Sequence, residues 1–299
     1  MNIEILYSII IPHYNTPKLL QRLVDSIPQK DDLEVIIVDD NSDEGKKPKI
    51  VRDDVQIYLL NSDQSKGAGR ARNIGIEKAK GKWLLFADSD DFFSEEMYEI
   101  ISEYSNSSYD MIMFKANSVD SETLLPSDRD AGINRSIDSY LNGLISAQVA
   151  SLGVHSPWCR MISKNFVINN NLKFDEVIAS NDTMFTTKVS CLAKSIGVSN
   201  RILYTVTFRQ GSLWNSRKNA DNYLARIEVY IRRKQYLSSI GINTPPMIIP
   251  LLKMGYVDFY TNLKAFLMVY RSGFLFQNTI GYLKKLINRK FSQKNEKSI

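Results

Sequence analysis

Residues 33–43 read LEVIIVDDNSD, an apolar run rich in β-branched side chains that stops at a cluster of acidic and amide residues. A short continuous apolar run of this kind is typical of a strand buried on both faces of a parallel sheet. Three further runs have the same character: residues 5–12 (ILYSIIIP), 56–60 (QIYLL) and 82–87 (KWLLFA). Helical spacing occurs between these runs, over residues 18–26 and over residues 69–80 before Gly81. This alternation predicts an α/β fold with an open, twisted, mostly parallel sheet flanked by helices.

The sequence changes character near Asn215. Before it, residues 110–115 predict one more strand and residues 141–193 mix turns with two helical stretches. Beyond it, the spacing predicts helices over residues 221–238 and 250–270. We therefore expect two parts, which are an α/β domain over residues 1–215 and a basic helical C-terminal region over residues 216–299.

Composition narrows the class of protein. With 43% hydrophobic and 24% charged residues, the 299-residue chain is ordinary globular material and not a disordered one. Cys159 and Cys191 have no CxxC partner, so we expect neither a disulfide framework nor a zinc site, and a reducing compartment fits best. The first residues, MNIEILYSIIIP, have no basic segment ahead of the apolar run. We expect no secretory signal, a cytoplasmic location and no nucleic-acid partner.

The positive charge is concentrated near the C-terminus. Residues 231–299 hold twelve lysine and arginine residues against Asp258 and Glu296. Residues 282–291, YLKKLINRKF, interleave apolar and basic side chains, which suits an amphipathic helix on an anionic membrane surface. A solvated helix packed on its own domain explains the pattern equally well. We expect no membrane-spanning helix, because charged residues interrupt the most apolar region, 256–276. Peripheral attachment to the inner face of the cell membrane remains open.

Polar clusters follow three of the predicted strands. They are PHYN at residues 12–15, DDNS at residues 39–42 and DSDD at residues 88–91. Each cluster alone is explained as a turn or a helix cap, since Asp, Asn and Ser favour both. Ligands of open α/β sheets, however, bind beyond the carboxyl ends of the strands. Three such ends together predict one shared pocket.

Asp88 and Asp90 form an Asp-x-Asp pair directly after an apolar strand. Two carboxylates on one tight turn suit a hard divalent cation, and Mg²⁺ or Mn²⁺ is the expected guest. Such a cation is usually held by one or two carboxylates together with phosphate oxygens. The pair therefore predicts a diphosphate ligand, with the cation stabilising the charge of a departing diphosphate.

Residues 65–73, SKGAGRARN, place two glycines and two arginines at the start of a predicted helix. A cation in the first turn opposes the helix dipole, so a purely structural role is disfavoured, whereas a bound anion satisfies both the arginines and the helix end. The segment matches neither the Walker loop nor the dinucleotide fingerprint. It predicts a phosphate-facing loop of another kind.

Taken in order, SIIIPHYN, EVIIVDDNSD, KGAGRARNIG and WLLFADSDD resemble the motifs of family 2 glycosyltransferases of the GT-A fold, over roughly residues 5–215. The resemblance implies inverting sugar transfer, usually from a UDP-sugar with Mn²⁺ or Mg²⁺. It further implies a donor half over about residues 1–115 and an acceptor half over about residues 116–215.

The resemblance also implies roles for residues of these motifs. The implied donor-binding residues are Pro12 and Tyr14 on the uracil, Asp40 and less certainly Asp39 on the base or ribose, Gly67, Arg72 near the diphosphate, and Asp88 with Ser89 near the ribose and metal. Asp90 is the implied direct metal ligand, with Asp88 as its partner, and Asp91 is a neighbour only.

A later segment resembles the stretch of this family that carries the catalytic base. In that family an acidic pair precedes a helix, and its second carboxylate deprotonates the acceptor hydroxyl. The corresponding residues here are 181–185, NDTMF. Asn181 replaces the first acid here, which leaves Asp182 as the candidate base. The alternative is that Asp182 only caps the following helix. His13 and His155 are the chain's two histidines, and a structural role is expected for both.

Three functions remain open from the sequence. The leading one is an inverting glycosyltransferase acting on a glycan or lipid-linked saccharide, in bacterial surface polysaccharide synthesis. A sugar-phosphate nucleotidyltransferase also needs an α/β sheet and a metal, but its glycine-rich loop belongs beside the first strand, where PHYN stands. The third is a nucleotide-sugar-binding protein without catalysis, which the presence of Asp88, Asp90 and Asp182 disfavours.

Overall fold

The structure, a computed structural model, describes residues 4–208, 219–277 and 279. These residues form two compact units. The first comprises residues 4–177 and 181–208, and the second comprises residues 178–180 together with the described residues from 219 onward. The boundary expected near Asn215 and the basic stretch 282–291 lie outside the described residues.

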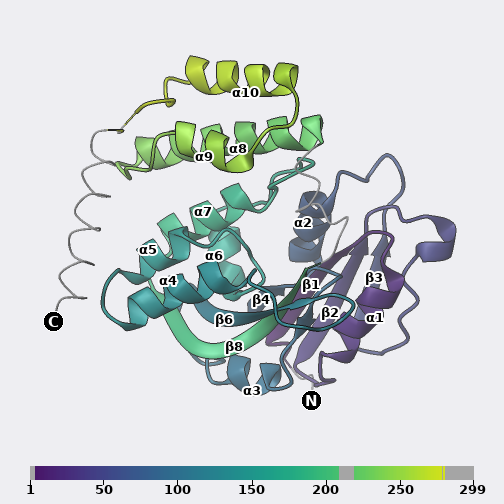
Figure 1. Cartoon of the computed structure of the whole chain (residues 1–299). Coiled ribbons are helices and arrows are strands. Elements are labelled where there is room, and N and C mark those ends of the chain that lie inside the picture. The colour runs from purple at the N-terminus through teal and green to yellow at the C-terminus, as the bar shows by residue number, and fades with distance from the viewer. Residues whose placement is uncertain (1–3, 209–218, 278, 280–299) are drawn as a thin grey trace. The chain divides into compact units, whose positions relative to one another are not determined.

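One mixed sheet of eight strands organises the described part of the first unit, in the order β3-β2-β1-β4-β7-β6-β8-β5 (Figure 1). The strands are β1 (Tyr7–His13), β2 (Leu33–Asp39), β3 (Val55–Leu59), β4 (Trp83–Phe86), β5 (Phe92–Phe93), β6 (Met111–Asp120), β7 (Arg160–Ser163) and β8 (Ile196–Phe208). The first four strands along the chain pair in parallel, as the apolar runs predict. β6 and β8 are also parallel, while β7 and β5 pair antiparallel with their neighbours.

The register of the parallel strands brings their polar ends to one edge. β1 and β2 pair from Tyr7 opposite Leu33 to His13 opposite Asp39, so both strands end together. β4 pairs with β1 up to Phe86 opposite Ile10, and the chain then enters the DSDD turn. All three polar clusters therefore leave the sheet at the same edge, which is the arrangement that the sequence predicts.

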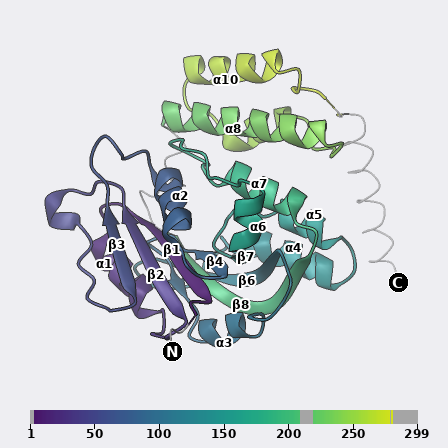
Figure 2. The ribbon, with the colours of Figure 1, turned by 180° about the vertical axis from the view of Figure 1, so that it is seen from behind.

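Helices cover the sheet of the first unit (Figures 1 and 2). They are α1 (Pro17–Asp25), α2 (Ala68–Lys78), α3 (Met97–Ser102), α4 (Ala131–Leu141), α5 (Ala147–Leu152), α6 (Lys164–Asn169) and α7 (Thr183–Leu192), with a short 3₁₀ turn at Glu44–Lys46. α1 begins with proline at its first position, where the missing N–H costs nothing. α2 packs on β1 and β2, and Gly75 is where its backbone approaches the sheet, facing Ile10.

Three strands were not predicted from the sequence. β7 has only four residues, RMIS, and two of them are polar or charged. β5 has two residues and pairs with β8 through Phe92 opposite Thr205. β8 is a long strand whose burial alternates in its first half and becomes continuous later. The strand expected at residues 110–115 extends to Asp120 because β8 continues to pair with it.

The second unit is helical, with α8 (Ala220–Ser239), α9 (Ile248–Met254) and α10 (Phe259–Arg271). The helical stretch expected over residues 250–270 is interrupted at Gly255, whose φ of 80° is left-handed. Buried side chains between α8 and α10, such as Tyr223, Ile227 and Val269, form a core of its own. Among the described residues, no helix has the length and apolar composition needed to cross a bilayer.

The contact between α2 and β1 can be tested at Gly75. A Cβ atom added there would lie 2.3 Å from Cγ2 of Ile10, so we expect Gly75→Ala to lower the free energy of unfolding by about 1–3 kcal/mol through overpacking. Gly132 in α4 is the matched control, since a Cβ there meets open space and alanine stabilises a helix by about 0.5–1 kcal/mol relative to glycine. Urea unfolding followed by tryptophan fluorescence measures both variants. Equal midpoints for the two would contradict this close approach.

Candidate active site

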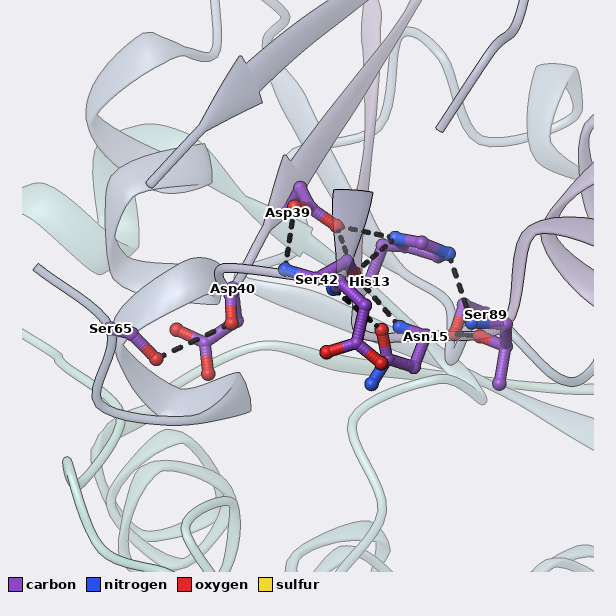
Figure 3. A network of polar contacts seen from close by, with 9 residues as sticks. His13, Asn15, Asp39, Asp40, Ser42, Ser65 and Ser89 are labelled. Atoms are coloured by element: carbon purple, nitrogen blue, oxygen red, sulfur yellow. Dashed lines mark hydrogen bonds and ion pairs between the residues drawn. The ribbon is translucent and has the colours of Figure 1, made fainter. Parts of the chain in front are cut away.

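A network of hydrogen bonds joins the ends of the parallel strands (Figure 3). Nδ1 of His13, at the end of β1, lies 2.6 Å from Oδ1 of Asp39, at the end of β2. The hydroxyl of Ser42 donates to the same oxygen, and its backbone N–H donates to the other oxygen. Nε2 of His13 accepts the backbone N–H of Thr16. His13 thus links the ends of β1 and β2 and the start of α1, which is the structural role expected from the sequence.

Asp39 and Asp40 take different roles in this network. Asp39 is fully buried with both oxygens hydrogen-bonded inside the protein, so it shapes the strand ends. The carboxylate of Asp40 accepts the backbone N–H groups of Lys66 and Gly67 and so holds the loop that precedes α2. Gly67 has a left-handed φ of 81°, which glycine adopts without strain. A contact of either aspartate with a nucleotide stays a prediction.

Tyr14 and Pro12 also differ in exposure. The ring of Tyr14 is 57% exposed at the end of β1, where an aromatic face is free to stack on a base. Pro12 is buried within β1, opposite Val38 of β2. Of the pair assigned to the uracil by resemblance, Tyr14 presents a side chain at the surface, whereas Pro12 contributes to the strand itself.

The DSDD turn after β4 is held from two sides. Oγ of Ser89 lies 2.9 Å from Oγ1 of Thr16, at the start of α1. The backbone carbonyl of Asp90 accepts hydrogen bonds from Arg22 of α1, at 2.6 Å, and from the hydroxyl of Thr207 in β8. These bonds fix the backbone of the turn, so the Cα positions of Asp88 and Asp90 are fixed as well.

Asp91 has a larger part in this turn than the sequence indicates. It is buried, and its carboxylate accepts hydrogen bonds from the hydroxyl of Tyr204 and the backbone N–H of Thr207. The Tyr204 hydroxyl also accepts the backbone N–H of Asp88, at 2.9 Å. Burial, together with the charges of Asp90 and Asp88, holds the pKa of Asp91 well above its usual range. Its partners in β8 lie more than a hundred residues away, so no local signal announces them.

Arg72 joins the DSDD turn to the later segment. Its guanidinium donates to Oδ1 of Asp88 at 2.5 Å and to Oδ1 of Asn181 at 2.7 Å. Its charged group also lies 5.3 Å from the ring centroid of Phe174. Arg72 follows Ala68 by four residues and so lies in the second turn of α2. Arg72 thus lies one turn further into α2 than expected, and Asp88 compensates its charge; its contact with a diphosphate stays a prediction.

The segment around Asn181 is docked on α2. Asn73 exchanges two hydrogen bonds with the backbone of Phe174. Gly69 allows the approach, since a Cβ atom there would lie 2.0 Å from the carbonyl oxygen of Asp175. Arg70 and Lys66 both form ion pairs with Glu176. The first half of α2 therefore holds residues 174–176, a few residues before Asp182, in place.

Asp182, the candidate base, lies at the start of α7 and has a raised pKa. It immediately precedes α7, and among the described residues its side chain makes no capping hydrogen bond of the usual kind to that helix. Hydrogen bonds from the backbone N–H groups of Asp182 and Thr183 lower the pKa of its carboxyl, so the capping alternative stays open beside the catalytic one. Burial raises the pKa of Asp182 to about 6, while the charge of Arg72 lowers it and that of Asp88 raises it. A carboxylate with a pKa near neutrality is suited to take a proton from a hydroxyl.

The carboxylate oxygens of Asp88 and Asp90 suit a cation that is held jointly by the protein and a diphosphate. Within residues 4–208, 219–277 and 279, no group of three or more His, Cys, Asp or Glu side chains is placed to hold a metal ion. Two carboxylates on one turn, Asp88 and Asp90, agree with a cation that takes its remaining ligands from a diphosphate. Asp88 is 36% exposed at its side chain and accessible to such a ligand, while one of its oxygens is engaged by Arg72.

Comparison with solved structures identifies the fold class. The chain superposes on TarS of Staphylococcus aureus in complex with UDP-GlcNAc with a TM-score of 0.56 at 20% identity, covering 77% of this chain and 66% of that one. A mannosyltransferase from Pyrobaculum calidifontis, in complex with GDP-Man and Mn²⁺, gives a TM-score of 0.52 at 15% identity, covering 89% of this chain and 73% of that one. The fold is that of GT-A glycosyltransferases, as the sequence predicts.

Sequence comparison then gives the family. The model of glycosyl transferase family 2 matches residues 8–169, and the chain belongs to that family. Poly(ribitol-phosphate) β-N-acetylglucosaminyltransferase TarS of Staphylococcus aureus strain MW2 is 26% identical over 220 residues, which are 70% of this chain and 37% of TarS. Glycosyltransferase GlyG of Streptococcus pneumoniae is 34% identical over 101 residues, which are 32% of this chain and 34% of GlyG. The matches span about a third of the length of these two relatives.

The buried Asp91 gives a test of the site's electrostatics. Because its pKa is raised in the folded chain, the native state keeps a proton that the unfolded chain releases, and the contribution of Asp91 to stability falls as pH rises above the usual aspartate range. An amide in its place cannot titrate. We expect the free energy of unfolding of Asp91→Asn, relative to wild type, to increase between about pH 5 and about pH 8. The exposed Asp53→Asn is the control and should show no such trend. A relative loss of stability on raising the pH would show that the fold favours ionised Asp91.

Proposed function

We propose that this chain transfers a sugar from a UDP-sugar to a hydroxyl group of a glycan or lipid-linked saccharide, with inversion at the anomeric carbon. One observation carries the proposal. Arg72 bridges Asp88, on the turn expected to hold the donor diphosphate, and Asn181, the residue before the candidate base. A donor-side carboxylate and a base with a raised pKa are thereby joined through one side chain.

The proposed chemistry is a single displacement. Asp182 accepts the proton of the acceptor hydroxyl as its oxygen forms a bond to the anomeric carbon, and the bond from that carbon to the diphosphate oxygen breaks. Attack opposite the leaving group inverts the anomeric centre, and one carboxylate base suffices for it. Tyr14 offers an exposed ring for the base of the nucleotide, and Asp40 fixes the Gly67 loop that precedes α2.

Asp88 and Asp90 would hold a divalent cation, Mn²⁺ or Mg²⁺, together with diphosphate oxygens. When bound, such a cation neutralises negative charge on the departing diphosphate. Arg72 already places one positive charge against Asp88, which reduces the repulsion between this carboxylate and an incoming donor. Family membership disfavours the nucleotidyltransferase alternative, and no contact in the described residues supports it.

UDP is the proposed nucleotide because the relative TarS was solved with UDP-GlcNAc, whereas the mannosyltransferase was solved with GDP-Man. Calorimetric titration of the chain with UDP and with GDP, each with and without Mn²⁺, separates these donors. We expect UDP to bind only with the metal. Asp90→Ala should weaken this binding by about tenfold or more, because losing one charged ligand costs about 1.4 kcal/mol or more of binding free energy. Asp53→Ala, an exposed aspartate elsewhere, is the control.

Preferential binding of GDP would replace the proposed donor. No nucleotide binding under any of these conditions would contradict the proposed activity and favour a protein that has lost catalysis.

The role of Asp182 predicts a pH profile. Its pKa of about 6 means that the carboxylate form, the one that accepts a proton, grows as pH rises through that value. Sugar transfer at saturating substrate should therefore rise through about pH 6 and level off above it. We expect Asp182→Asn to lower the rate by about 10²–10⁴-fold without weakening UDP binding.

Asp128→Asn, an exposed acid shortly before α4, should leave both the rate and the profile unchanged. Transfer by Asp182→Asn at the wild-type rate would remove the base assignment while leaving the nucleotide site intact.

A further inference from the structure

Helix α10 of the second unit has its small residues inside and its large apolar residues outside. Thr261, Ala265 and Val269 are its buried side chains, at the spacing of one helical stripe. The exposed side chains on the remaining circumference include Phe259, Tyr260, Leu263, Phe266, Leu267 and Tyr270. Tyr260 is 80% exposed and Tyr270 is 64% exposed. This distribution is the reverse of that of an ordinary surface helix.

The six exposed side chains form a continuous face, which we call the α10 face. On a helix with 3.6 residues per turn they occupy adjoining positions, and the rings of Phe266 and Tyr270 stack with an interplanar angle of 12°. Leu252, Tyr256 and Phe276 of the same unit are exposed as well. An apolar surface of this extent marks a binding site for another surface.

The charged residues of α9 and α10 beside the α10 face are mostly positive, while the exposed acids Asp221 and Glu228 of α8 line a pocket together with Lys264. Lys264 and Arg271 lie along one border of it in the helical projection, and both are exposed, as is Lys253 at the end of α9. Asp258 is the one acidic residue in the sequence 244–277. Its carboxylate accepts the backbone N–H of Thr261 and so caps α10. The chain after residue 279 adds six lysine and arginine residues and one glutamate.

We infer that the α10 face docks the protein on a bilayer surface that contains anionic lipids, with the helix lying in the plane of the interface. Phe and Leu side chains bury in the acyl boundary, while the hydroxyls of Tyr260 and Tyr270 remain at the headgroups. Lys264 and Arg271 then meet lipid phosphates. Thirteen residues span about 20 Å, too short to cross the hydrocarbon core, so α10 lies on the membrane.

A second copy of the chain fits the α10 face less well. A symmetric pair would bring two copies of Lys264 and Arg271 toward the same interface, and like charges there oppose association. An anionic surface complements both the apolar face and its basic border. This inference concerns a surface of the second unit and does not rest on the proposed function.

Vesicle flotation with the full chain tests the inference. We expect wild-type protein to float with vesicles of phosphatidylcholine and phosphatidylglycerol, to float less at high salt, and to remain below vesicles of phosphatidylcholine alone. The triple variant Phe259→Ser, Phe266→Ser, Tyr270→Ser should lower the bound fraction by about tenfold or more, since three apolar side chains no longer insert. These side chains are exposed, so circular dichroism and the unfolding midpoint should match wild type.

Two controls separate the contributions. Lys264→Glu with Arg271→Glu should lower flotation several-fold with the anionic vesicles, because basic residues near an anionic surface strengthen attachment and acidic ones oppose it. Val51→Ser and Leu144→Ser remove exposed apolar side chains of the first unit and should float as wild type does.

Two outcomes would overturn the inference. One is wild-type protein that stays below every vesicle preparation, or a triple variant that floats like wild type. The other is that neither protein floats, while light scattering shows a dimer for wild type and a monomer for the triple variant. That result would assign the α10 face to a second copy of the chain.

Discussion

The site depends on one buried cation, Arg72. Its side chain is almost inaccessible to water, and a charge in that position is tolerated only when it is paired. The pairing is with Asp88 on one side and Asn181 on the other, at distances of 2.5 and 2.7 Å. One helix thereby fixes the distance between two segments that the sequence separates by almost a hundred residues. The close approach at Gly69 and the two bonds of Asn73 make the same contact rigid.

The electrostatics of the site follow from burial and from crowded carboxylates. Burial is the main cause of the raised pKa of both Asp91 and Asp182; the charges of Asp90 and Asp88 add to it for Asp91, and that of Asp88 adds to it for Asp182. Burial favours the protonated form of Asp91, and the hydrogen bond from the Thr207 backbone N–H opposes this in part. Asp182 is moderated by Arg72, which keeps its pKa near neutrality. The same arginine therefore both assembles the site and sets the strength of its candidate base, so the two functions cannot be separated by changing that residue alone.

The sequence predicts the parallel strands β1 to β4 and the start of β6, but not β5, β7 and β8. β1, β2 and β4 are recognisable because strands buried on both faces need apolar residues at every position. β7 and β5 are too short to show a pattern. Asp91 was expected to be a mere neighbour of the metal pair. Its role depends on β8, and neither the partner strand nor its register is encoded near residue 91.

Hydrophobic periodicity has a further limit, which α10 illustrates. The pattern of residues 250–270 predicts helical structure but not the break at Gly255, and in α10 the larger apolar side chains are the exposed ones while the stripe of Thr261, Ala265 and Val269 is buried. Small residues allow close approach to α8, whereas bulky ones there would push the helices apart. Periodicity therefore indicates that a face will be covered, without indicating by what. In α10 the covering surface has to match aromatic rings bordered by lysine and arginine. The acyl boundary of an anionic bilayer matches the rings, and its phosphate headgroups match the basic residues.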